Sequence, residues 1–322
     1  MVAGGRALSS MRAATWGLVM VSVEARAQLD KMFADKREER RVYPEGKPLE
    51  LRRRDWEADA RLDILPKGAR FQPVSADGVK SEWMEMPFNI KERVVLWLHG
   101  GGYNAGSPKI YRKMAAYVSK AVRAKALVPD YRLAPEHVFP AAVTDALKAY
   151  GFLLEQGFTE ENIVIGGDSA GGGLTLSMLL ALREARAKMP RCAVVFSPWT
   201  DLSCSGATYE RLRKLDPVID KEGLAEAGRW YAGERETKDP MASPMYADLS
   251  GLPPLLVQVG GDETMLDDSR VFAERVRAAG VDATLKIYEG MWHVHQSGMP
   301  DVPESQAAYN DVAAFIRAQF GD

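Results

Sequence analysis

The stretch Ile163-Val164-Ile165-Gly166-Gly167-Asp168-Ser169-Ala170-Gly171-Gly172-Gly173 decides the fold of this 322-residue chain. It begins apolar and β-branched, as a buried strand does, and continues after Ser169 with a helical composition. Glycines flank the serine at the turn because a Cβ there would collide with the strand or the helix. The sequence therefore predicts a strained strand–turn–helix unit. The Ser169 hydroxyl would stand at a helix N-terminus, whose dipole favours negative charge.

Short β-rich runs alternate with helical patterns on both sides of this unit, from about residue 66 onward. This alternation is typical of an α/β fold, with a mostly parallel sheet and helices on both of its faces. We expect eight strands, the first two forming a hairpin with Asp77-Gly78 near its turn. The expected strands are Phe71–Val74, Glu82–Met86, Arg93–Leu98, Ala126–Asp130, Ile163–Gly166, Ala193–Ser197, Leu255–Val259 and Ala283–Tyr288. The expected helices between them are Tyr111–Ala121, Ala141–Glu155, Ser169–Ala187, Asp267–Ala279 and Ser305–Phe320.

Two regions fall outside this rhythm. Residues 1–65 have the pattern of two helices broken near Tyr43–Gly46, and residues 201–250 separate two strands by more than a usual crossover, with a helix over Lys221–Tyr231. We predict that both regions form one helical cap, whereas residues 66–322 form a single α/β domain that carries the 201–250 insertion. Five apolar side chains of the cap are expected either to roof a ligand pocket or to pack the cap together: Met32, Phe33, Leu224, Trp230 and Tyr231.

Composition narrows the class of protein. The formal net charge is −2 and 46% of the residues are hydrophobic, so neither nucleic acid nor a membrane is expected as a partner. The two cysteines fit a reducing compartment, and a cytoplasmic protein is expected. The apolar stretch Ala13–Val23 is too short to span a bilayer, which needs about 20 apolar residues. We interpret it as part of an amphipathic N-terminal helix in preference to a signal peptide.

The serine turn has a chemical counterpart one strand earlier. Val94–Leu98 is expected to be buried, and it ends in His99-Gly100-Gly101-Gly102-Tyr103. Acyl transfer to a serine passes through an oxyanion, which needs preorganised N–H donors about 3 Å away. Such donors typically come from a glycine loop and from the residue after the nucleophile. We therefore assign Ser169 as a nucleophile and Gly101, Gly102 and Ala170 as oxyanion donors. His99 is interpreted as a structural residue that holds the loop.

A base and an orienting acid should follow the nucleophile along the chain, in the order serine, carboxylate, histidine. Only His293 and His295 come after Ser169, both beyond the last strand, and a metal pair made by the two is the alternative. The carboxylate should follow Leu255–Val259. Asp262 is the first acid after that strand and is predicted to orient the base, with Glu263 as the second choice.

The chain resembles the bacterial hormone-sensitive-lipase-like esterases from about Val74 to its C-terminus. The resemblance rests on seven segments: HGGGY at 99–103, DYRLAPEH at 130–137, FPAA at 139–142, GDSAGG at 167–172, SPW at 197–199, DETMLDDS at 262–269 and GMWH at 290–293. It implies an α/β-hydrolase fold with 66–322 as the catalytic domain and Ser169, Asp262 and His293 as the triad. A two-part cap, short- to medium-chain acyl esters as substrates and no cofactor are also implied.

Alternatives to an esterase stay open at this stage. An amidase, an arylformamidase-like enzyme or a deacetylase would use the same three residues, and a ligand receptor on this fold would have lost them. Tyr103 is expected to line the pocket. Arg132 and Glu136 are interpreted as a structural ion pair or a loop brace, in preference to a role in the pocket. The expected partner is a small-molecule ester, with no metal, and a homodimer is left open.

Overall fold

The computed structural model describes residues 21–322. The N-terminal stretch that the sequence assigns to an amphipathic helix, up to Met20, lies outside these residues. Within the described part of the chain, no helix is both long and apolar enough to cross a membrane.

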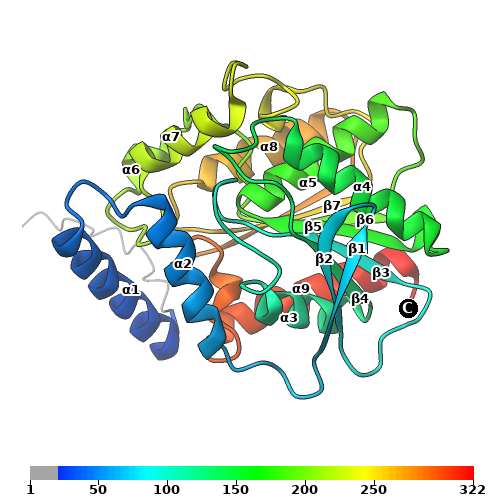
Figure 1. The fold of residues 1–322 in the computed structure, drawn as a ribbon, viewed down its shortest axis with the longest axis horizontal. Helices are drawn as coiled ribbons and strands as arrows, with labels where there is room; N and C mark the ends of the chain where they lie inside the picture. Colours follow the sequence, from blue (N-terminus) through cyan, green and yellow to red (C-terminus); the bar gives the residue numbers. More distant parts are fainter. Residues whose placement is uncertain (1–20) are drawn as a thin grey trace, which may run out of the picture.

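One eight-stranded sheet forms the centre of the molecule, with the strand order β1-β2-β4-β3-β5-β6-β7-β8 (Figure 1). β1 pairs with β2 and β2 with β4 in antiparallel fashion, and all later pairs are parallel. The predicted α/β class is therefore confirmed, as is the hairpin, which turns at Asp77 and Gly78. The strands are β1 (Arg70–Ala76), β2 (Val79–Glu85), β3 (Val94–Leu98), β4 (Lys125–Pro129), β5 (Ile163–Asp168), β6 (Cys192–Phe196), β7 (Leu255–Gly260) and β8 (Ala283–Tyr288).

Helices cover both faces of the sheet and make two apolar layers. On one face lie α3 (Arg112–Val122) and α9 (Pro303–Phe320), and on the other α4 (Ala141–Glu155), α5 (Ala170–Glu184) and α8 (Leu266–Ala278) (Figure 1). Strand β3 shows why both faces must be covered. Its residues Val94, Leu96 and Leu98 belong to the α4–α5–α8 layer, whereas Val95 and Trp97 belong to the α3–α9 layer. Since successive side chains of a strand point to opposite faces, an entirely apolar strand needs apolar partners on each face.

The remaining helices lie beyond the sheet, where the sequence predicted a cap. They are α1 (Val23–Val42), α2 (Leu49–Asp59), α6 (Thr208–Arg211) and α7 (Lys221–Ala232), and Figure 1 shows them on one side of the molecule. Short 3₁₀ helices cover Ala60–Leu62, Glu160–Asn162, Pro244–Tyr246 and His295–Gly298.

α1 is tied to distant parts of the chain at both of its ends. Before its first turn, the Ser22 hydroxyl and main-chain N–H each donate to the carboxylate of Glu304 in α9, both at a distance of 2.7 Å. Further along, Lys36 donates to the main-chain oxygens of Asp216 and Ile219 in the 201–250 insertion. α1 therefore bridges the insertion and the last helix. The division into a cap and a catalytic domain stays a prediction.

Candidate active site

Ser169 lies at the turn between β5 and α5 in a strained conformation, with φ 53° and ψ −122°. The surrounding main chain leaves no space for side chains at the two flanking glycines. A Cβ on Gly167 would lie 2.4 Å from the oxygen of Gly171, and one on Gly171 would lie 2.0 Å from the oxygen of Leu98. The predicted steric reason for the glycines is confirmed. The turn presents the Ser169 hydroxyl beyond the carboxyl end of the sheet, where α/β folds bind ligands.

His293 is the imidazole that contacts this hydroxyl. Its Nε2 lies 2.9 Å from Ser169 Oγ, although the two residues are 124 positions apart in the chain. His295, the other candidate, is fully buried against the Tyr288 ring, and neither of its ring nitrogens has a hydrogen-bond partner among residues 21–322. Burial lowers the pKa of His295 to about 3, so it stays neutral. The structure therefore brings His293, and not His295, to the serine.

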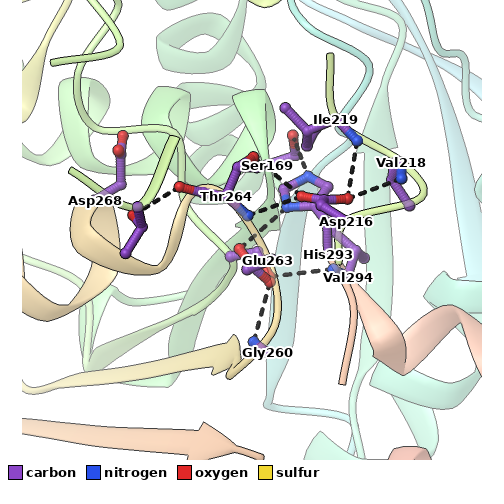
Figure 2. Close-up of polar contacts among 12 residues, drawn as sticks. Ser169, Asp216, Val218, Ile219, Gly260, Glu263, Thr264, Asp268, His293 and Val294 are labelled. Atoms are coloured by element: carbon purple, nitrogen blue, oxygen red, sulfur yellow. Dashed lines mark hydrogen bonds and ion pairs between the residues drawn. The ribbon is translucent and has the colours of Figure 1, made fainter. Parts of the chain in front are cut away.

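The carboxylate on the other side of His293 belongs to Glu263. The residue predicted to orient the base, Asp262, does not make this contact. Oε1 of Glu263 lies 3.2 Å from His293 Nδ1 (Figure 2). Its Oε2 accepts from the Ser197 hydroxyl at 2.7 Å and from the Gly260 N–H at 3.0 Å. Ser197 in turn accepts from the N–H of Val294, the residue after the histidine. Glu263 is completely buried and held by donors on every side.

The turn after β7 explains the difference. The strand ends at Gly260, and the main-chain N–H of Asp262 donates to the Met291 oxygen. The Asp262 side chain is partly exposed. Burial raises its pKa, and the like charge of Glu289 raises it further. Only Gly261 separates the end of the strand from Asp262, and the acid that faces His293 is the next residue, Glu263.

Electrostatics at His293 favour the imidazolium that forms when the ring takes up a proton. Burial is the largest single effect and lowers the pKa of its imidazole, but the neighbouring carboxylates, Glu263 foremost, together raise the pKa above its ordinary value. Asp216 and Asp168 act in the same direction as Glu263. A neutral His293 with its proton on Nδ1 donates to Glu263 and leaves Nε2 free to accept from Ser169.

The glycine loop after β3 adopts left-handed conformations that favour glycine, with φ 115° at Gly101 and 64° at Gly102. In the described part of the chain, neither of their N–H groups donates to another main-chain group. Ala170 is the first residue of α5, where a helix leaves its N–H groups unpaired. His99 braces the loop, as predicted: its Nδ1 donates to the Gly100 oxygen at 2.8 Å, and its ring stacks on Tyr131. All three predicted oxyanion donors therefore carry N–H groups not used by the loop itself.

Comparison with known proteins agrees with this geometry. A sequence profile of the α/β-hydrolase fold matches residues 95–297. The crystal structure of an esterase from the bacterial hormone-sensitive lipase family is 40% identical and superposes with a TM-score of 0.86 over 91% of this chain and 98% of that chain. The chain belongs to the bacterial hormone-sensitive-lipase family. An acetyl-hydrolase of Streptomyces hygroscopicus is 39% identical over 269 residues, covering 84% of this chain and 88% of the relative. The esterase EstE5, solved after soaking with p-nitrophenyl butyrate, is 37% identical with a TM-score of 0.87, covering 94% of this chain and all of that chain.

In this family member, Arg132 and Glu136 each form an ion pair, but with other residues and not with each other. Arg132 pairs with the carboxylate of Asp145 at 2.9 Å. Glu136 forms a two-pronged pair with Arg53 of α2, whose guanidinium holds the pKa of Glu136 down at about 2. Arg53 also donates to the main-chain oxygen of Asn104 at 2.6 Å. Helix α2 is thereby fixed against the end of the oxyanion loop.

The predicted pocket residues of this hormone-sensitive-lipase relative separate into two groups. Tyr103 and Tyr231 are fully buried and stack face to face, with ring centroids 3.6 Å apart, and Leu224 is buried in the same core. Trp230 packs against that core. Met32 and Phe33 pack instead beside Met291 and Trp292, on the loop that carries His293. Phe33 also lines a cleft of about 460 Å³ between α1 and residues 213–220.

Proposed function

We propose that this chain is a serine carboxylesterase whose triad is Ser169, His293 and Glu263. One observation carries the proposal: His293 Nε2 lies 2.9 Å from Ser169 Oγ, while a buried carboxylate lies at its Nδ1. A base within hydrogen-bond reach of a hydroxyl and itself oriented by a third group is the arrangement that activates a serine. Family membership supports ester hydrolysis as the reaction, since the relatives described above are called esterase and acetyl-hydrolase.

The reaction would proceed in two acyl transfers. Ser169 Oγ attacks the ester carbonyl carbon as its proton passes to His293 Nε2, and the imidazolium then gives that proton to the departing alcohol oxygen. An acyl-serine remains. Water attacks it with His293 again as the base, and the serine leaves with the proton while the carboxylic acid is released. Glu263 keeps the Nδ1 proton in place and stabilises the imidazolium in both halves.

The N–H groups of Gly101, Gly102 and Ala170 would hold the negative charge that develops on the carbonyl oxygen. The left-handed glycines and the first turn of α5 supply these donors without rearrangement, and preorganised donors are the largest single term in many acyl transfers. No step needs a metal, because His293 carries out each proton transfer and the N–H donors stabilise the negative charge on the carbonyl oxygen.

We further propose short- to medium-chain acyl esters as substrates and the cytoplasm as the setting. The acetyl-hydrolase relative and the p-nitrophenyl butyrate used with EstE5 support the short acyl chain. Cys192 and Cys204 are both free and buried, which suits a reducing compartment. A deacetylase acting on amides would share the triad, and it stays as an alternative that substrate choice decides.

The test combines one variant with one covalent probe. Ser169→Ala should lower kcat on p-nitrophenyl butyrate by a factor on the order of 10⁶ with no loss of folding, because alanine keeps the Cβ of this buried residue and removes only the hydroxyl that faces His293. Phenylmethylsulfonyl fluoride should label wild-type Ser169 alone, as located by peptide mass spectrometry. Labelling at another serine would overturn the assignment, and faster cleavage of p-nitroacetanilide than of p-nitrophenyl acetate would replace esterase by amidase.

A further inference from the structure

Asp216 is a buried carboxylate that the steps above leave unused. It lies in the insertion between α6 and α7, and the residue is 1% exposed. No arginine, lysine or histidine of residues 21–322 forms an ion pair with its carboxylate, since Lys36 of α1 reaches only its main-chain oxygen. A buried carboxylate without a cation is costly unless hydrogen bonds satisfy it. The hydrogen-bond donors around Asp216 therefore indicate its role.

Four donors occupy its two oxygens. Oδ1 accepts from the N–H groups of Val218 and Ile219, at 2.8 and 3.0 Å. These bonds stabilise a local turn within the insertion. Oδ2 accepts from the N–H and the hydroxyl of Thr264, at 2.8 and 3.0 Å. Only the first pair is needed to shape the insertion. The second pair crosses to the turn between β7 and α8, 48 residues further along the chain.

That turn carries the proposed catalytic acid. The N–H of Thr264 belongs to the peptide group that directly follows Glu263, so Asp216 holds a main-chain nitrogen two bonds away from the Glu263 Cα. The insertion also holds Thr264 from its other side, because the Thr208 hydroxyl of α6 donates to the Thr264 oxygen at 2.7 Å. Figure 2 shows Asp216 and Glu263 both beside His293, each from a different segment of the chain.

We propose that Asp216 is a positioning residue for ester hydrolysis: it fixes the turn that carries Glu263 and places a second negative charge beside the imidazolium of His293. The inference rests on the function proposed above. The charged groups that act on His293 are Glu263 from the β7–α8 turn, Asp216 from the insertion and Asp168 from the end of β5, and each raises its pKa against burial. One side chain of the insertion thus contacts the turn that carries the acid and also adds negative charge beside the base.

The pH dependence of kcat/KM separates this role from a purely structural one. Asp216→Asn removes the charge at nearly constant shape, so the imidazolium loses support and the acidic limb should move to lower pH by roughly 0.5–1 unit. Its kcat on p-nitrophenyl butyrate should fall by about 10- to 100-fold with KM within about twofold, since imidazolium forms only after the substrate is bound. Asp216→Ser, a smaller neutral side chain with one acceptor oxygen, answers the same question if the asparagine variant folds poorly.

Two matched variants complete the design, with active sites counted by organophosphate titration so that only folded enzyme is compared. Asp220→Asn makes the same charge change in the same insertion, but at an exposed helix cap that asparagine also satisfies, and it should leave the limb and kcat unchanged. Thr264→Val removes one hydrogen bond and keeps the charge, so the limb should stay in place.

A neutral Asp216 variant with an unmoved acidic limb, or a limb that moves equally in Asp220→Asn, overturns the inference. The proposed function fails in a different way, through a wild-type enzyme without esterase activity or with its label away from Ser169. The two failures are therefore distinguishable.

Discussion

Replacing Glu263 with glutamine tests the triad at the point where its acid had to be chosen between two neighbours. Both carboxylate oxygens accept: Oε1 faces His293 Nδ1, and Oε2 takes donors from Ser197 and Gly260. A glutamine has one acceptor oxygen and one NH₂ group. If the oxygen faces His293, the NH₂ group opposes the N–H of Gly260, which cannot rotate away. If the NH₂ group faces His293, Nδ1 must accept, and the proton moves to Nε2, where it blocks proton uptake from Ser169.

Neither orientation is satisfied without cost in a site closed to water, because Glu263 is fully buried: the first opposes two donors, and the second forces the wrong tautomer on His293. The tautomer that removes the base is the costlier outcome, and loss of the correct tautomer lowers kcat by about 10³- to 10⁴-fold in serine hydrolases. That corresponds to about 4–5.5 kcal/mol of transition-state stabilisation. We therefore expect Glu263→Gln to lose activity by this factor while KM changes little.

The assay is steady-state hydrolysis of p-nitrophenyl acetate, normalised by organophosphate titration, with thermal unfolding as the check on folding. Asp262→Asn is the matched control: it makes the same chemical change one residue away, on a partly exposed side chain that does not touch His293. We expect it to retain activity within about threefold. A loss of 100-fold or more in Asp262→Asn, together with less than tenfold in Glu263→Gln, would refute the reasoning.

Two further predictions concern the base and the first helix. The acidic limb of wild-type kcat/KM should lie above pH 6.5, because the pKa of His293 is raised and only its neutral form accepts a proton. His295→Ala should leave that limb in place. A shifted limb in this variant would show that the wrong histidine was chosen. Deleting residues 1–35 removes the contacts of Phe33 with the His293 loop and should lower kcat on p-nitrophenyl acetate, butyrate and octanoate; a folded truncated enzyme with unchanged rates on all three would show that α1 does not support the site.

The sheet and the nucleophile follow from local rules, which is why the sequence predicted them. Strands such as Val94–Leu98 are apolar at every position, and only burial on both faces of a sheet explains that pattern. Ser169 could be located because steric exclusion leaves glycine as the residue that fits on either side. His293 followed from chain order together with the resemblance to known esterases. Each of these inferences depends on residues close together in the sequence.

The remaining features of the site depend on which way side chains face in the folded protein, and no local sequence pattern indicates that. Asp262 and Glu263 are adjacent acids, and the choice between them is made by the course of the chain after Gly260. Asp216 lies in an insertion without a recognisable motif, and its importance comes from Thr264, which is distant in sequence. The side chains of Tyr103 and Tyr231 were expected at a pocket, yet they stack on each other inside the core. An apolar cap residue satisfies the same pattern whether it faces a ligand or a neighbour.

The hydrogen bonds between Ser22 and Glu304 join positions 282 residues apart, and this has a consequence for synthesis on the ribosome. Of the helices in residues 21–322, α1 is made first, but its anchor lies in α9, which is made last. At about 5–20 residues per second, roughly 15–60 s pass before the two can meet. Throughout that interval Leu29, Met32 and Phe33 lack Met291, Trp292 and Val302, the residues they pack beside in the finished protein. Among the helices of residues 21–322, the first to leave the ribosome is thus among the last to dock, and its few apolar side chains stay uncovered until the C-terminal segment arrives.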